Sequence, residues 1–86
     1  MRPFRYVEQK HLSKQLQDAY NARIARNVRD CRIRQGLSVP QLARSLHCTT
    51  AWIYMIESGK RPVTTRTLAQ LAEIFGVDPA MLSEPL

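Results

Sequence analysis

The chain has 86 residues, 44% of them apolar, which suits a single small domain with a modest core and leaves little room for an enclosed catalytic cleft. Thirteen Lys and Arg against seven Asp and Glu give a formal net charge of +6, which favours a polyanionic partner such as a nucleic acid or an acidic membrane surface. No apolar run approaches the ~18 residues of a membrane-spanning helix, and the N-terminus has no signal-like apolar stretch, so we expect a cytoplasmic protein without a membrane partner.

The positive charge is concentrated in the first part of the chain. Residues 1–36 hold nine Lys and Arg against three Asp and Glu, whereas the four basic and four acidic residues that follow cancel. This segment is therefore the part that a polyanion would attract most strongly. Charge runs are also commonly no more than a solvated helix face, so both interpretations stand.

The sequence indicates neither a metal site nor a catalytic site. The nearest group of metal ligands is Cys31, His47 and Cys48, with His11 further away, and it lacks the close-spaced ligand pairs of zinc sites. Core packing is the better interpretation of both cysteines. No Ser/His/Asp set, carboxylate pair or Gly-rich phosphate loop has convincing spacing, so we expect a protein without a cofactor that is not an enzyme.

The N-terminal third should contain an arm and two helices. Residues 1–7 resemble an extended arm, and a helix should run from about Glu8 to Asp18. Two apolar stripes follow helical spacing: Leu12, Leu16 and Ala19 in the first, and Ile24, Val28 and Cys31, ended by Gly36, in the second. On one continuous helix these stripes would face different directions. We therefore predict a break within 19–22, with Asn21 as the N-cap.

Cap residues divide the rest of the chain into short helices. Ser38 is a natural N-cap, and Pro40 sits in the first turn, where a missing N–H costs nothing. The further caps are Thr49, then Thr64 or Thr65, then Asp78, with Gly59 and Gly76 as stops. The apolar stripes are Leu42, Ala43 and Leu46; Ile53 and Ile56; Leu68, Leu71, Ala72 and Phe75; and Met81 and Leu82. Five or six helices with short connections predict a compact all-α domain.

Two of these helices, Val39–Leu46 and Thr49–Ser58, have the pattern of a helix-turn-helix. The motif needs a small residue where the helices cross, and Ala43 supplies it. It also needs apolar residues to fix the crossing: Leu42, Leu46, Cys48, Ile53 and Ile56. The outer face of the second helix is then free to enter the major groove of DNA.

The sequence at this point resembles the XRE family of phage-repressor and Cro-type domains. The family's Ser-x-x-x-Leu-Ala is present from Ser38 to Ala43, and its Leu-x-x-Leu-Ala-x-x-Phe-Gly-Val from Leu68 to Val77. Between them, Ile53, Ile56, Glu57, Gly59 and Lys60 match Ile-x-x-Ile-Glu-x-Gly-Lys, with Pro62 after Arg61. The resemblance implies a five-helix repressor-like domain over 21–86, preceded by a basic arm with an extra helix over 1–20.

The resemblance also implies a role for each exposed position. In the recognition helix, Thr50, Ala51 and Met55 would lie closest to base edges, flanked by Thr49, Trp52 and Tyr54. Phosphates would be held by Gln41, Lys60 and Arg61 and by backbone N–H groups where the second and fourth helices begin, the latter at Thr64. Arg32 and Glu57 match an ion pair inside the family fold, so we assign them to stability.

Three positions depart from the family pattern. His47 stands where a left-handed turn usually has glycine, a conformation that His tolerates better than most residues. Val39 replaces a polar phosphate-contacting residue, and Trp52 replaces a small or polar one. The recognition face also lacks the Gln, Asn or Arg that reads purines bidentately, although Thr, Ala and Met can contact thymine methyl groups. Trp52 either stacks on the sugar-phosphate surface or packs on the N-terminal segment.

Two questions stay open at the level of sequence. The N-terminal segment either contacts DNA, with Arg2 and Arg5 as candidates, or docks on protein through Phe4, Tyr6, Val7, Leu12 and Leu16. This apolar set and the group Met81, Leu82 and Leu86 are the two candidates for a homodimer contact.

We expect a sequence-specific regulator of transcription, and a repressor in particular, that binds duplex DNA as a homodimer on a two-fold operator. The alternative is a protein-interaction module, or a DNA-binding antitoxin-type partner subunit, whose recognition face binds protein. For the regulator itself, control by a regulatory protein partner is left open.

Overall fold

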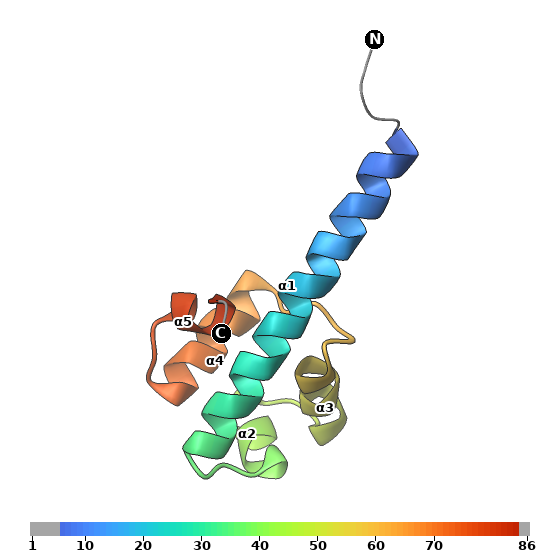
Figure 1. Ribbon diagram of the computed structural model, residues 1–86. Helices are drawn as coiled ribbons and strands as arrows, with labels where there is room; N and C mark the ends of the chain where they lie inside the picture. Colours follow the sequence, from blue (N-terminus) through green and yellow to red (C-terminus); the bar gives the residue numbers. More distant parts are fainter. Residues whose placement is uncertain (1–5, 85–86) are drawn as a thin grey trace.

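The computed structural model describes the backbone of residues 6–84 and the side chains of residues 13–84. The described chain is all-helical, as predicted, with five helices: α1 (Tyr6–Arg34), α2 (Val39–Leu46), α3 (Thr50–Ser58), α4 (Thr65–Phe75) and α5 (Pro79–Ser83). The C-terminal half of α1 forms the central element of the bundle. Helices α2 and α3 lie on one side of it and α4 and α5 on the other, while the N-terminal half of α1 projects beyond them (Figure 1).

The predicted break within 19–22 is wrong, because α1 is one helix of 29 residues. The Asn21 side chain does not cap a new helix; its Oδ1 accepts a hydrogen bond from Gln17 Nε2, four residues earlier, at 3.0 Å. The two apolar stripes do face different directions on this helix, and the described members of the first stripe, Leu16 and Ala19, are exposed. Ile24 and Val28 have no exposed surface, whereas Leu16 is 68% exposed. A continuous helix is therefore compatible with both stripes.

The continuous helix also changes the assignment of the arm. Tyr6 and Val7 already belong to α1, so they are not part of an extended segment. The arm candidates Arg2, Phe4 and Arg5 lie outside the described residues, as does Leu86.

The core is formed by the apolar positions that the sequence predicts. The fully buried side chains are Ile24, Val28, Leu42, Ile53, Ile56, Leu71 and Leu82, together with Ala43, Ala72 and Phe75 at 3% exposure or less. Leu82 is therefore wrong as a dimer contact, because it packs inside its own domain with no exposed surface. Asn27 holds the C-terminal end in place by donating from Nδ2 to the backbone oxygens of Leu82 and Glu84, at 2.9 Å each.

The predicted caps are present at the helix starts. Ser38 and Gln41 form a reciprocal capping box at α2, and the hydroxyls of Thr49 and Thr64 accept from the backbone N–H groups of Trp52 and Thr67. Each of these bonds satisfies an N–H that has no partner within the helix. The boundaries of the helix-turn-helix are thus set by local side-chain chemistry.

The residue that ends α2 adopts the left-handed conformation that the sequence predicts. His47 has φ 58° and ψ 47°, and it is the one non-glycine residue with positive φ in the described chain. Its backbone N–H and that of Cys48 bond to carbonyls of the last turn of α2, which fixes the tight connection to α3.

Replacing His47 with glycine should stabilise the domain. A side chain in this conformation costs about 1–2 kcal/mol, of which the greater freedom of an unfolded glycine cancels part. We expect a net gain of about 0.5–1 kcal/mol, or roughly 4 °C in Tm by thermal unfolding. Gly76→Ala is the matched control, since Gly76 has φ 70° and an added Cβ would meet no atom within 4 Å. The control should lower Tm; a lower Tm for His47→Gly as well would contradict the prediction.

Candidate nucleic-acid interface

The crossing of α2 and α3 is built as the helix-turn-helix pattern requires. Ala43 at the crossing is 3% exposed, and Leu42, Ile53 and Ile56 are buried in the common core. Leu46 and Cys48 pack against this core from its edge. The inner face of α3 is thus fully used for packing, which leaves its opposite face to solvent.

The outer face of α3 is a continuous exposed stripe. Neighbouring members of the stripe are three or four residues apart, which places them on one side of the helix. They are Thr50, Ala51, Tyr54, Met55 and Ser58. Tyr54 is 61% exposed and Met55 37% exposed. The predicted base-contacting residues Thr50, Ala51 and Met55 therefore share one accessible surface, and Ser58 extends it by a residue that the sequence analysis did not select.

Trp52 packs rather than projecting freely from α3. Its ring is half-buried against the core, and the Arg61 guanidinium lies over it with Cζ 5.4 Å from the ring centroid. A cation in this position is attracted by the electron-rich face of the ring. Of the two interpretations of Trp52, packing agrees with the structure, although its partners are the core and Arg61. Arg61 remains exposed, and its guanidinium is held over Trp52 in the first turn of α3.

The predicted phosphate-binding groups differ in how many of their hydrogen-bond donors are left without a partner in the protein. Gln41 is exposed, and its Oε1 accepts from the Ser38 N–H at 2.8 Å, so only its amide NH₂ is left to donate outward. At the start of α2, Pro40 has no N–H and the Gln41 N–H is taken by the Ser38 hydroxyl, which leaves the N–H of Val39. The start of α2 is therefore a poorer anion site than the sequence suggests.

The start of α4 has more unsatisfied donors. Thr64 is its N-cap and takes the Thr67 N–H, so the N–H groups of Thr65 and Arg66 are left without a partner inside the helix. The Arg66 side chain is exposed in the same first turn, and the exposed side chain of Lys60 lies in the preceding loop.

Arg32 and Glu57 form the ion pair that the sequence predicts. Arg32 Nε and Nη2 donate to the two carboxylate oxygens of Glu57 at 2.7 and 3.1 Å, and Nη1 donates to the Leu37 carbonyl at 2.9 Å. The two side chains are only 14% and 8% exposed. The hydrogen bonds to Glu57 raise the pKa of Arg32 above its ordinary value, against the lowering effect of burial. The pair joins α1 to the end of α3.

Arg29 is a residue near this pair that the sequence analysis missed. A shallow groove between α1 and α3 is lined by Arg29, Arg32, Tyr54, Glu57 and Ser58. The signal that could have identified Arg29 is the three-residue spacing of Arg23, Arg26, Arg29 and Arg32 along α1. That spacing places Arg29 one turn from Arg32, on the side of α3.

Cys31, His47 and Cys48 do not come together as a metal site among the side chains that the structure describes, those of residues 13–84. No group of three metal-ligating side chains lies close together there. Burial raises the pKa of the Cys48 thiol, whose Sγ contacts the Thr49 carbonyl at 3.6 Å. None of the described helices has the length and apolar character that crossing a membrane requires.

Comparison with known proteins agrees with this geometry. Residues 23–84 match the family model described as "Helix-turn-helix domain". The chain belongs to this helix-turn-helix family. The match and the fold identify the domain as XRE-type, a class of DNA-binding regulators of transcription.

A solved structure supports the same assignment for this helix-turn-helix protein. It is similar to the restriction-modification controller protein C.AhdI from Aeromonas hydrophila, with a TM-score of 0.70 and 25% sequence identity. The likeness covers 74% of this chain and 97% of the other. No curated protein sequence matches the chain. The family match begins inside α1, so the division of the chain at residue 20 stays a prediction.

Proposed function

We propose that this protein is a sequence-specific regulator of transcription that inserts α3 into the major groove of a two-fold DNA operator as a homodimer, and that it acts as a repressor. The observation that carries the proposal is the exposed stripe of α3, whose opposite face is fully packed in the core. The likeness to a restriction-modification controller protein also favours a regulatory role over a catalytic one.

The composition of the stripe favours a particular way of reading DNA. Thr50, Ala51 and Met55 offer methyl groups and one hydroxyl, so we expect contacts with thymine methyl groups rather than bidentate contacts with guanine. Phosphate contacts from Lys60, Arg61, the exposed amide of Gln41 and the N–H groups at the start of α4 would set the orientation. Most of the affinity would then come from the DNA backbone.

The homodimer needs an accessible apolar surface. Met81 on α5 is 51% exposed and remains a candidate, and Leu16 on the projecting part of α1 is 68% exposed. In a two-fold complex the two α3 helices would lie about 34 Å apart, one turn of DNA.

Selection of bound sequences from a pool of random duplexes tests this proposal. We expect a two-fold symmetric consensus with half-sites centred about 10 base pairs apart and rich in thymine. Enrichment of no sequence, together with capture of a protein that covers α3, would contradict it and favour the interaction-module alternative.

A further inference from the structure

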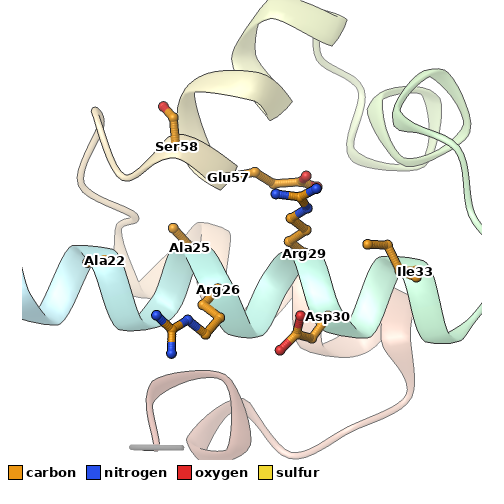
Figure 2. A pocket seen from close by; sticks show the side chains of 8 residues that line it. All are labelled: Ala22, Ala25, Arg26, Arg29, Asp30, Ile33, Glu57 and Ser58. Carbon is orange, nitrogen blue, oxygen red and sulfur yellow. The ribbon is translucent and has the colours of Figure 1, made fainter.

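The groove between α1 and α3 carries an arginine that no other described residue neutralises. A neighbouring hollow, drawn in Figure 2, shares Arg29, Glu57 and Ser58 with this groove, and in it the Arg29 side chain extends from α1 towards α3. Arg26 and Asp30 also line that hollow, but their side chains extend to the other side of α1 and neither lines the groove with Tyr54. Among residues 13–84, Arg29 makes no ion pair and no side-chain hydrogen bond. Its charge is therefore available to a ligand.

The nearby carboxylate does not cancel this charge. Both oxygens of Glu57 accept hydrogen bonds from Arg32, and the Glu57 side chain is only 8% exposed. Of the charged residues that line the groove, Arg29 and Arg32 are positive and Glu57 is negative, which leaves one positive charge in excess. The groove is thus suited to an anion.

The groove opens beside the face that we propose to bind DNA. Tyr54 lines the groove and also belongs to the exposed stripe of α3. A duplex held against this stripe would bring its sugar-phosphate backbone to the edge of the helix, where an exposed phenol and a guanidinium can donate hydrogen bonds. Ser58 contributes less, because its hydroxyl donates to the Met55 carbonyl at 3.0 Å.

We propose that Arg29 and Tyr54 together bind a backbone phosphate of the DNA, so that the first helix adds a contact from outside the helix-turn-helix. This inference rests on the proposed function, since it assumes that α3 faces DNA. It assigns a role to a basic residue of α1, where the excess positive charge of the chain lies.

Arg29→Ala and Arg26→Ala form a matched pair for the test. Both residues are exposed, both changes remove one positive charge from α1, and only Arg29 lines the groove with Tyr54. The measurement is the affinity of the full chain for a fluorescein-labelled random-sequence duplex as a function of NaCl concentration. For Arg29→Ala we expect the slope of log affinity against log salt to fall in magnitude by about 0.9 for each protomer bound. Arg26→Ala should leave the slope nearly unchanged.

Tyr54→Phe adds a test that does not change charge. Loss of the hydroxyl should weaken binding to the random-sequence duplex and to a selected duplex by the same factor, since a phosphate contact does not depend on sequence. Circular dichroism melting should show that all three variants fold like the unmodified protein.

The outcomes separate this inference from the proposed function. If the unmodified protein binds duplex DNA but Arg29→Ala and Arg26→Ala behave alike, the phosphate contact is refuted and the proposed function stands. If the unmodified protein binds no duplex, both are refuted. A smaller salt slope for Arg29→Ala alone supports the contact.

Discussion

Glu57→Ala should lower the free energy of unfolding by about 3 kcal/mol or more, because it leaves the Arg32 guanidinium nearly buried without its counter-charge. The two side chains are 14% and 8% exposed, so water can replace little of what is lost. Arg32 also donates to the Leu37 carbonyl in the turn before α2, so its displacement would loosen the start of the helix-turn-helix. Small domains have about 5–15 kcal/mol of stability in total. Urea denaturation followed by the fluorescence of Trp52, the single tryptophan, measures the change.

Replacing both members of the pair provides the control for this prediction. The double variant Arg32→Met with Glu57→Leu removes both charges and keeps the volume, and it should recover much of the lost stability. Exposed ion pairs at a protein surface contribute less than about 1 kcal/mol to the free energy of unfolding. If Glu57→Ala lowered the free energy of unfolding by no more than that, the ion pair would not be what holds α1 to α3.

Thr50→Ala combined with Met55→Ala, which removes two base contacts in each half-site, should reduce the preference for the operator by about thirtyfold for each half-site, or roughly a thousandfold for a two-fold operator. The reason is that each lost base contact costs about 1–3 kcal/mol of discrimination. Both side chains are exposed on α3 and neither caps a helix, so the fold should be unaffected. The affinity for a random-sequence duplex should change by less than about twofold, because phosphate contacts carry it. Competition between a selected and a random-sequence duplex measures the ratio.

Ser45→Ala with Gln70→Ala is the matched control for that pair. These residues are also exposed, but they line a separate pocket between α2 and α4, away from the stripe of α3. The control should keep the operator preference. An unchanged preference in the Thr50/Met55 variant would mean that other residues read the bases.

Much of the fold could be predicted because it depends on local chemistry. The helix starts are predictable because each has an N-cap hydroxyl that accepts a hydrogen bond from a backbone N–H of the first turn: Ser38, Thr49 and Thr64. The spacing of the apolar residues then indicates the buried face of the short helices. The continuity of α1 could not be predicted, because periodicity does not show which apolar stripe is packed. Leu16 and Ile24 look alike in sequence, yet one is exposed and the other is buried.

The candidate site was harder to predict than the fold. The stripe of α3 follows from its helical spacing, but the partners of Trp52 and the orientation of Arg29 depend on contacts between elements distant in the chain. Leu82 was misassigned for the same reason, since only the packing of α5 against the rest of the domain shows that it is buried.

The central claim is that this domain binds duplex DNA through a helix-turn-helix, and the salt dependence of duplex binding by the full chain tests it most directly. For about four phosphate contacts, we predict a roughly hundredfold loss of affinity between 50 and 200 mM salt. If neither a selected nor a random-sequence duplex binds even at about 50 mM salt, where such contacts are strong, the claim is wrong.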